Sequence, residues 1–480
     1  MNYKVVLSIL GKTMLIEALL LIVPMLVGVY YQEDNLMAFL IPIIGLCVVG
    51  GPLSFLKSED GAMYAKEGFV TVALAWIIMS LIGAVPFVLG GEITSYIDAV
   101  FETVSGFTTT GASILNNVEK LSKSMMFWRI FTHWIGGMGV LVFVLAVMPG
   151  YSAGAMHVFR AESPGPTVGK LVSKLSFTAR ILYAIYMVMT VIQVVLLLFG
   201  GNDLYSSILL SFSTAGTGGF GLLNSSAGSY SDYTQIVLSV FMLLFGVNFN
   251  VYYLILIGNF SKAFKCEEVR VYLIAILVTT LAVAINITSL IGNFGQALKH
   301  AFFQVTSIGS TTGLTTYDYT MWPAFSQAIL LLLTVMGACG GSTGGGMKIA
   351  RVCILYKSCS SEFKRLIHPR AVVTTKFEGE PITKDTESNV KTFFILWVLI
   401  VVVSTLLLSL DGYFSVFDNF SATLACIGNV GPGFGLVGPT YNYAGYSDLS
   451  TILLSLVMLV GRLEIFPILI LFAPRTWRRA

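Results

Sequence analysis

The chain has 480 residues, of which 56% are hydrophobic and only 11% are charged, and its mean hydropathy is +0.83. Soluble domains carry about 25% charged residues, so this composition excludes a soluble protein and predicts an integral membrane protein. The net charge of +3 comes from loops between apolar stretches and gives no indication of nucleic-acid binding. The six cysteines show no paired spacing, which argues against a disulfide framework and against Cys-based metal binding.

Apolar stretches long enough to cross a bilayer, about 20 residues each, recur along the whole chain. They cover residues 9–30, 36–56, 68–89, 125–148, 178–200, 233–260, 271–293, 324–357, 391–410 and 449–473. These ten predicted spans place both chain ends on the same side of the membrane. The first stretch lacks a small-residue cleavage site and runs on to a second span, so we predict no cleaved signal peptide.

Basic residues predict the orientation. Under the ten-span interpretation, 23 of the 28 Lys and Arg fall on one face, in segments 1–12, 57–67, 150–180, 261–270, 348–391 and 474–480. Acidic residues are spread more evenly, and Glu102 is among those expected on the other face. Cytoplasmic loops are enriched in Lys and Arg. The basic face, with both termini, is therefore predicted to be cytoplasmic.

A polar, glycine-containing segment recurs between the spans. Residues 101–111, FETVSGFTTTG, align with residues 303–313, FQVTSIGSTTG, and weaker copies are SFSTAGTGGF at 211–220 and ACIGNVGPG at 425–433. Each copy follows an apolar segment of about 10–15 residues, which is too short to cross a bilayer and fits a re-entrant half-helix. The anchoring glycines of this alignment are Gly111, Gly218, Gly313 and Gly431.

The recurrence predicts an all-α integral membrane protein with a fourfold pseudo-symmetric plan. Each unit contains a span, a short pore helix, a polar loop and a second span around a central pore. The predicted parts are two leading helices (1–67), repeat 1 (68–150), repeat 2 (151–265), repeat 3 with a broken second helix (266–360), and a cytoplasmic loop with repeat 4 (361–480).

Four such loops could form a cation-selective filter. Non-helical backbone at membrane depth must be buried or line a water-filled path, and rings of carbonyls can replace the hydration shell of a cation. Glycine permits the backbone dihedrals that turn carbonyls inward, and the helix C-termini would favour a cation. The loops contain no Asp or Glu, which disfavours a divalent-cation filter. Ordinary outer turns are the alternative, but recurrence at four equivalent positions favours a filter. The candidate filter residues are Thr109, Thr110, Gly111, Thr217, Gly218, Thr311, Thr312, Gly313, Asn429, Val430 and Gly431.

A second glycine cluster, GACGGSTGGG at 337–346, lies inside the 34-residue stretch 324–357. A straight helix of that length would measure about 51 Å, whereas the hydrocarbon core is about 30 Å thick. We therefore predict that the helix breaks and that the glycine-rich segment forms a loop below the third filter segment, where it could gate the pore. A close-packing face between helices is the alternative. The candidate gate residues are Gly340, Gly341, Ser342, Thr343, Gly344, Gly345, Gly346, Lys348 and Arg462.

Ionisable residues within the spans form a further set of candidates, because such residues are usually paired or functional. Arg462 is predicted either to hold the glycine-rich loop or to repel cations, and the alternative is that its helix ends early and its side chain reaches the cytoplasmic interface. Glu17 has no evident partner in the sequence.

Several motifs carry no function here. GTGGFG at 216–221 fits a dinucleotide pattern but follows no strand, and residues 341–348 lack the Ser or Thr of a phosphate-binding loop. The four histidines are scattered, and no catalytic dyad is present. The chain is therefore predicted to be neither an enzyme nor a nucleotide-binding protein.

The segments TTTGA, STTGL and NVGPG, together with GGSTGGGMK and GRLEIF, resemble the Trk/Ktr/HKT cation transporter superfamily over essentially the whole chain. Within it, the chain is most similar to the membrane subunit of bacterial Trk potassium-uptake systems. The resemblance implies a multi-pass protein of the bacterial cytoplasmic (inner) membrane that transports potassium and binds no cofactor of its own. It also implies a homodimer with one pore per protomer, and a cytoplasmic regulatory ring of the TrkA type that binds NAD(H) or ATP/ADP.

The same resemblance implies that the four anchoring glycines belong to the filter and that residues 337–348 form the gate with Arg462 as its partner. In the superfamily, serine at the first position accompanies sodium preference, so glycine at all four positions implies potassium preference. The adjacent Gly218 and Gly219 leave the register of the second filter segment open by one residue.

Two alternatives stay open within the same pore plan. One is the potassium-translocating subunit of a P-type ATPase, and the other is a sodium-preferring or ion-coupled symporter of the superfamily. A secondary transporter with inverted halves is disfavoured because the four loops are predicted on one side. The sequence does not distinguish channel-like permeation from coupling to protons or sodium.

Overall fold

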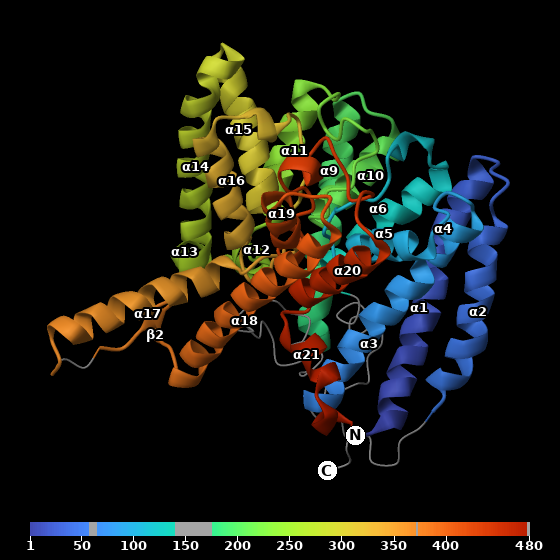
Figure 1. The fold of residues 1–480 in the computed structure, drawn as a ribbon, viewed down its shortest axis with the longest axis horizontal. Coiled ribbons are helices and arrows are strands. Elements are labelled where there is room, and N and C mark those ends of the chain that lie inside the picture. The colour runs from blue at the N-terminus through green and yellow to red at the C-terminus, as the bar shows by residue number, and fades with distance from the viewer. Residues whose placement is uncertain (57–64, 140–174, 371–372, 478–480) are drawn as a thin grey trace.

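The computed structural model describes residues 1–56, 65–139, 175–370 and 373–477. Within these residues the fold is helical except for one antiparallel hairpin, formed by β1 (Lys376–Phe377) and β2 (Glu380–Pro381) (Figure 1). Residues 57–64 of the predicted basic segment 57–67, residues 150–174 of the predicted basic segment 150–180 and residues 140–148 of the predicted span 125–148 lie outside the described residues.

Two long helices precede the rest of the fold, α1 (Tyr3–Tyr30) and α2 (Met37–Ser54). They pack along each other through small residues, as is common for helices within a membrane. A Cβ atom at Gly11 of α1 would lie only 2.8 Å from the carbonyl oxygen of Gly50 on α2. Glycine at this contact is therefore what allows the two backbones to approach.

The remaining helices repeat one arrangement four times. A long first helix is followed by a short helix and then by a second helix. The first helices are α3 (Ala65–Gly83), which α4 (Val85–Leu89) extends, α9 (Leu175–Phe199), α14 (Glu267–Ile291) and α18 (Lys384–Leu408). The short helices are α5 (Tyr96–Phe107), α10 (Leu204–Ala215), α15 (Phe294–Gly309) and α19 (Val416–Ile427). The second helices are α6 (Lys123–Gly137), α11 (Asp232–Phe245), α16 (Ala324–Met336) and α20 (Asp448–Arg462).

Contacts between these helices follow one cyclic pattern. Each short helix packs against the first and second helices of its own unit. Each second helix also packs against the short helix of the next unit, in the pairs α6 with α10, α11 with α15, α16 with α19 and α20 with α5. The last pair joins the end of the chain to its first unit, so the four units close on themselves.

The short helices begin at side-chain caps. Ser95, Asp203, Asn293 and Ser415 each accept a hydrogen bond from a backbone N–H in the first turn of the helix that follows. Such caps satisfy donors that a helix start leaves free. The four helices are 12, 12, 16 and 12 residues long. They are too short to cross a bilayer, and their C-terminal ends lead into the glycine-containing segments.

Six helical segments are long and apolar enough to cross a membrane, and a seventh is counted if a bent pair forms one span; this number refers to the described residues only. The six coincide with the predicted spans 9–30, 36–56, 68–89, 178–200, 271–293 and 391–410. The protein is therefore a multi-pass membrane protein, and the count of ten spans stays a prediction.

The other four predicted spans coincide with second helices, which end partway along. α16 stops at Met336 and the chain resumes as helix only at α17 (Ile349–Ile367), which agrees with the predicted break. α11 meets α12 (Phe249–Leu256) at 90°, and α20 is separated from α21 (Phe466–Phe472) by three residues. The spans predicted over 233–260 and 449–473 therefore contain helix breaks that the sequence analysis did not predict.

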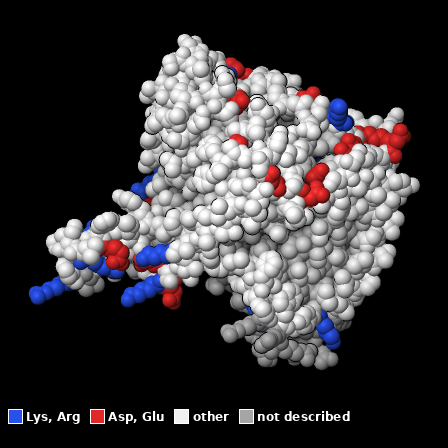
Figure 2. All heavy atoms as spheres, in the orientation of Figure 1, with Lys and Arg blue, Asp and Glu red and all other residues white. Residues whose placement is uncertain are grey.

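Charge is distributed unevenly along the molecule. On the face shown in Figure 2, Lys and Arg gather at the end of α17, α18 and the chain termini, and Asp and Glu predominate at the opposite end. The hydroxyl of Tyr3 donates to the carbonyl oxygen of Trp477 at 2.8 Å, so the two terminal segments meet at the basic end. A short helix, α13 (Phe260–Lys265), also contributes lysines there.

Candidate functional site

The four glycine-containing segments share one unusual backbone conformation. In each, a residue with left-handed φ is followed two positions later by a glycine with left-handed φ. The pairs are Thr109 (54°) and Gly111 (81°), Thr217 (53°) and Gly219 (82°), Thr311 (62°) and Gly313 (86°), and Asn429 (51°) and Gly431 (94°). This region is unfavourable for β-branched residues such as threonine, so packing and hydrogen bonds must hold the segments in place.

One hydrogen bond recurs in all four segments. The backbone N–H of the residue between the two left-handed positions donates back to a carbonyl in the last turn of the short helix. The pairs are Thr110 with Ser105 (2.9 Å), Gly218 with Ser213 (2.9 Å), Thr312 with Ser307 (2.8 Å) and Val430 with Ala425 (2.9 Å). Because the same donor position and the same acceptor position are used each time, the four segments are structurally equivalent.

This equivalence corrects the register of the second segment. The sequence alignment made Gly218 the counterpart of Gly111, but the residue with the matching dihedral is Gly219. Gly218 occupies the position of Thr110, since both donate to the helix carbonyl five residues earlier. The sequence left this register open because two glycines are adjacent in this copy and it does not show which of them needs the left-handed conformation.

The glycines also fit tightly between neighbouring segments. A Cβ atom at Gly111 would lie 2.1 Å from the carbonyl oxygen of Gly218. The corresponding distances are 2.0 Å from Gly219 to Thr312, 2.1 Å from Gly313 to Val430 and 2.5 Å from Gly431 to Thr110. Each segment thus touches the next in cyclic order, and the fourth touches the first. Any side chain at these positions would push into a backbone carbonyl of the adjacent segment.

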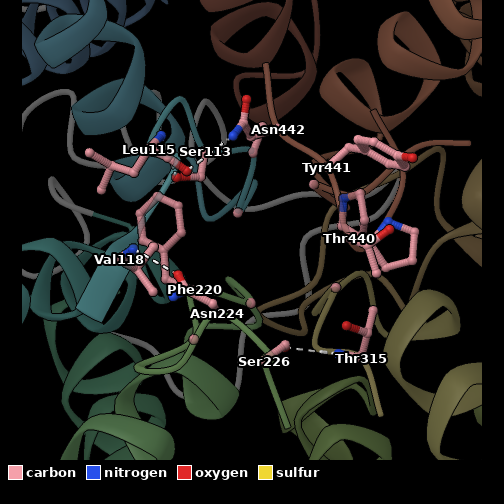
Figure 3. Close-up of a pocket in the computed structure, with 18 of the residues that line it drawn as sticks. Ser113, Leu115, Val118, Phe220, Asn224, Ser226, Thr315, Thr440, Tyr441 and Asn442 are labelled. Carbon is pink, nitrogen blue, oxygen red and sulfur yellow. Dashed lines mark hydrogen bonds between the residues drawn. The ribbon is translucent and has the colours of Figure 1, made fainter. Parts of the chain in front are cut away.

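All four of these glycines line one pocket with a volume of about 170 Å³. Figure 3 shows residues from the four segments arranged around it. Hydrogen bonds join neighbouring segments around the rim: Val118 N–H to Asn224, Thr315 N–H to Ser226, Thr440 hydroxyl to Asp318, and Asn442 amide to the Leu115 carbonyl. None of the described residues that line the pocket is acidic, and its polar groups are carbonyls, hydroxyls, amides and one guanidinium.

That guanidinium belongs to Arg129 of α6, which forms a buried ion pair with Glu102 of α5. The distance from Arg129 Nε to Glu102 Oε1 is 2.6 Å, and the two side chains are 2% and 0% exposed. Arg129 also donates to the Gly221 carbonyl at 3.2 Å and lies 3.6 Å above the ring of Phe220. Glu102 accepts from the Ile114 N–H at 2.9 Å. The pair therefore braces the first segment against the second.

The sequence analysis did not predict this brace. The available signal was the presence of two opposite charges next to apolar segments, because such residues are usually paired. Their separation of 27 positions gives no helical spacing that would have joined them. The fold brings them together because α5 packs directly on α6.

Removing one member of this pair is expected to destabilise the protein strongly. Arg129→Met leaves the buried carboxylate of Glu102 uncompensated, which costs about 3–5 kcal/mol. The double variant Glu102→Gln with Arg129→Met removes both charges and should lose less stability than the single variant. The measurement is the midpoint of thermal unfolding of the purified protein in detergent, compared across Arg129→Met, Glu102→Gln and the double variant. Purely additive losses would contradict the proposed brace.

His133 of α6 makes a second connection between the first two segments. Its Nδ1 lies 2.7 Å from the Gly106 carbonyl oxygen, and its Nε2 accepts from the Phe220 N–H at 3.2 Å. Its ring stacks on Phe220 with 4.1 Å between centroids. In the part of the chain that the structure describes, no group of three or more His, Cys, Asp or Glu is placed to hold a metal ion.

The glycine-rich segment 337–348 forms a non-helical loop between α16 and α17, and other broken helices satisfy its backbone. The Cys339 N–H donates to the Gly246 carbonyl at 3.1 Å, where α11 ends. The Phe249 N–H, where α12 begins, donates to the Gly341 carbonyl at 3.0 Å. Irregular backbone within a membrane needs partners of this kind. The break in α11 and the break after α16 therefore support each other.

The loop packs directly against the third and fourth glycine segments. The Gly345 N–H donates to the hydroxyl of Thr311 at 2.6 Å. A Cβ atom at Gly345 would lie 2.5 Å from the Gly428 carbonyl oxygen, and one at Gly344 would lie 2.7 Å from the Ser310 carbonyl oxygen. Close approach to the ends of α15 and α19 explains why these positions are glycine.

The other candidate gate residues lie within the same loop. The Gly340 N–H donates to the carboxylate of Glu268 at 2.6 Å, and the Ser342 hydroxyl donates to the Cys339 carbonyl at 2.6 Å. Gly346 has a left-handed φ of 79°. The buried ammonium of Lys348 donates to the Gly344 carbonyl, four positions earlier in the same loop.

Arg462, at the end of α20, connects the loop to the first unit. Its guanidinium donates to the Thr343 carbonyl at 2.9 Å and to the carbonyls of Gly136 and Gly137 at 2.5 and 2.9 Å. The helix does end at this residue. The side chain nevertheless points into the protein, so the alternative in which it reaches the membrane interface was wrong.

The residues after Arg462 form a further ion pair that the sequence did not predict. Glu464 has a left-handed φ of 56° and binds Arg351 of α17 at 2.5 Å. The Arg351 guanidinium also lies 4.0 Å above the ring of Phe393 on α18. Glu17 of α1, in contrast, is fully buried, and neither of its carboxylate oxygens has a hydrogen-bond partner among the described residues.

A multi-pass helical membrane protein in which four short helices lead into equivalent glycine segments around one pocket has the architecture of a membrane transport protein. The chain is a member of the TrkH family, described as cation transport proteins, because the family's sequence model matches residues 35–479.

Individual relatives agree over the full length. The chain is 33% identical to the Trk system potassium uptake protein TrkH of Escherichia coli K12 over 486 residues, covering 100% of both chains. It is 32% identical to the TrkH protein of Vibrio parahaemolyticus over 493 residues, again covering 100% of both chains. The crystal structure of the potassium transporter TrkH from Vibrio parahaemolyticus superposes with a TM-score of 0.90 at 30% identity and covers 100% of both chains.

Proposed function

We propose that this chain is the membrane subunit of a Trk-type system that takes up potassium across the bacterial cytoplasmic membrane. The observation that carries the proposal is the closed ring formed by Gly111, Gly219, Gly313 and Gly431, in which each glycine lies against a backbone carbonyl of the next segment. Rings of carbonyl oxygens can replace the hydration shell of potassium. The relatives of the chain are named potassium uptake proteins, which agrees with this chemistry.

The surroundings of the ring favour a monovalent cation. The four short helices direct their C-terminal ends, which carry partial negative charge, toward the segments. No carboxylate lines the pocket among the described residues, whereas divalent-selective pores commonly use rings of Asp or Glu. The filter positions in this proposal are the eleven predicted residues with Gly219 added as the second glycine. The fourfold arrangement around this ring forms the permeation pathway.

The glycine-rich loop is proposed to act as the gate. It contacts Thr311 in the third segment and lies under the ends of α15 and α19, where it obstructs passage. Arg462 and Lys348 hold its carbonyls and bring positive charge to this position. A permeating cation would be repelled while these two side chains stay in place.

The remaining parts of the proposal concern orientation and assembly. The basic end of the molecule, with both termini, faces the cytoplasm, in accord with the positive-inside rule. The assembly is a homodimer regulated by a cytoplasmic TrkA-like ring that binds NAD(H) or ATP/ADP. The relatives belong to Trk systems, which disfavours the alternative of a P-type ATPase subunit. The four ring glycines favour potassium over a sodium-preferring symporter.

The proposal is tested by reconstituting the purified protein in liposomes. With a potassium gradient we expect potassium flux that exceeds sodium flux under the same gradient. The flux should increase when a cytoplasmic regulatory partner with its nucleotide is added. Equal potassium and sodium fluxes would contradict the proposed filter.

A single substitution at Arg462 tests the gate separately. Arg462→Gln removes the charge that binds the carbonyls of Thr343, Gly136 and Gly137, and hydrogen bonds to charged groups contribute about 1.5–3 kcal/mol each. We expect a rise of several-fold in basal potassium flux without the partner, and an unchanged preference for potassium over sodium. Lys391→Gln is a suitable control, because this exposed residue pairs with Glu387 four positions away on α18, outside the filter and the loop. A basal flux equal to that of the parent would argue against the role of Arg462.

A further inference from the structure

Glu268 is a buried carboxylate in the first turn of α14, 4% exposed, and no part of the proposed filter or gate yet accounts for it. Its Oε1 accepts from the Gly340 N–H at 2.6 Å and from the Ala350 N–H at 3.1 Å. Gly340 lies near the beginning of the glycine-rich loop, and Ala350 lies just after its end. One oxygen atom therefore fastens both ends of the loop.

The second oxygen of Glu268 lies near another break in the helices. Its Oε2 is 3.5 Å from the side-chain amide of Asn248, which caps α12 directly after the bend from α11. Hydrogen bonds that involve a carboxylate are about twice as strong as those between neutral groups. Glu268 thus contacts the glycine-rich loop at one end, the first turn of α17 at the other end, and the bend between α11 and α12.

The position of Glu268 is set from the cytoplasmic side by the β1–β2 hairpin. The side chain of Glu378, at the turn of the hairpin, accepts from the backbone N–H groups of Glu267 and Glu268 at 2.9 and 3.1 Å. Glu267 in return accepts from the Glu378 N–H at 3.3 Å. Lys357 of α17 pairs with Glu267 and donates to the Lys376 carbonyl at 3.0 Å. The hairpin is therefore bound to the same helical turn that holds the loop.

We propose that Glu268 is a positioning residue that holds the glycine-rich loop in its obstructing conformation, and that Glu378 of the hairpin keeps Glu268 in place. A displacement of the hairpin would then move the first turn of α14 and release both ends of the loop together. This inference rests on the proposed function of the loop as a gate and adds the connection by which the cytoplasmic surface reaches it. Among the described residues, the side chains of Glu268 and Glu378 hydrogen-bond to Asn248, to the loop and to the first turns of α14 and α17, and not to the four glycine segments. The connection is therefore proposed to affect gating and to leave selectivity unchanged.

Three variants test the connection by potassium flux in liposomes without a regulatory partner. Glu268→Ala removes both acceptors, and we expect basal flux to rise about tenfold, the change that about 1.4 kcal/mol produces in an equilibrium. Glu268→Gln keeps one carbonyl oxygen that can accept from Gly340 and Ala350, so a smaller rise is expected. Glu378→Gln should give a rise smaller than that of Glu268→Ala, because it acts through the helix turn. The potassium over sodium preference should be that of the parent in all three.

Glu362→Gln is the matched control, because Glu362 is an exposed glutamate that pairs with Arg365 on its own helix. A merely structural role of Glu268 would lower thermal stability and flux together and would not raise basal flux. If Glu268→Ala does not fold, Glu268→Gln decides the question, and a basal flux equal to that of the parent overturns the inference. If deletion of the loop raises flux but neither Glu268 variant does, the loop still acts as the gate and Glu268 does not hold it in place. A loop deletion without effect would overturn the gate itself.

Discussion

Gly111→Ser is expected to reduce the preference for potassium over sodium by about tenfold or more, which corresponds to about 1.4 kcal/mol per factor of ten. The serine would have to adopt a φ of 81°, a conformation that L side chains rarely accept. Its Cβ would also lie 2.1 Å from the carbonyl oxygen of Gly218, so that carbonyl must move. Because the ring closes through contacts between neighbouring segments, a shift at this one contact alters the spacing of the oxygens that would face the ion. The measurement is relative potassium and sodium flux in liposomes.

Two other glycines provide the comparisons for this experiment. Gly313→Ser should have a similar effect, since Gly313 has a φ of 86° and its Cβ would lie 2.1 Å from the Val430 carbonyl oxygen. Gly201→Ser should leave selectivity unchanged. Gly201 has nearly the same φ as Gly111, 82°, but a Cβ atom there would meet nothing within 4 Å. If Gly111→Ser and Gly201→Ser shift the flux ratio equally, backbone strain explains the effect and contact around the ring does not.

The sequence predicted the four short helices and their polar segments because both are local patterns. Caps such as Ser95 and Ser415 precede short apolar runs, and glycine follows them. The sequence did not decide between Gly218 and Gly219 as the glycine with the left-handed conformation. That choice depends on which residue approaches the Thr312 carbonyl of the next segment, a contact between residues almost a hundred positions apart. Local composition is the same for either register.

Of the helix breaks, likewise, one could be predicted from the sequence and another could not. The glycine-rich break after α16 was predictable, because six glycines among residues 337–346 disfavour a helix. The break after α20 has no such signal. It places Glu464 and Ile465 in the left-handed region, which is unfavourable for both residues and most of all for the β-branched Ile465. Glu464 is held by its bond to Arg351, a residue 113 positions earlier in the chain. Long-range pairs of this kind, like Arg129 with Glu102, become visible only when the fold is known.

Arg462 forms more contacts than the reasoning from the sequence implied. The sequence linked this residue to the glycine-rich loop because a charge within an apolar stretch needs a partner. The structure shows that bond to the Thr343 carbonyl, and it adds the carbonyls of Gly136 and Gly137 at the end of α6. The guanidinium therefore joins the ends of two second helices to the loop. Any proposed gating motion has to break or exchange these bonds.

Deletion of residues 340–346 is expected to raise basal potassium flux by about tenfold or more, within the range of about 5–150-fold that coupling free energies of 1–3 kcal/mol produce. The chain can tolerate this deletion, because the two ends of the loop are already adjacent. The Ile349 N–H donates to the Ala338 carbonyl at 3.1 Å, and a Cβ at Gly337 would lie 2.8 Å from the Cα of Gly346. The deletion removes the contact between Gly345 and Thr311 and the carbonyls that Arg462 and Lys348 hold. Flux in liposomes without any regulatory partner is the measurement.

The deletion also tests whether the ions pass through the proposed ring. If the loop obstructs a path that begins at the four glycines, the deletion variant keeps the parent's preference for potassium over sodium and excludes a large organic cation such as choline. Adding Gly111→Ser to the deletion should then keep the high flux but reduce the preference for potassium, because the two changes act at different points along one path. A deletion variant that conducts no faster than the parent would rule out the gate. One that conducts potassium, sodium and choline alike would indicate a leak outside the ring, since the oxygens that discriminate between cations would have been bypassed.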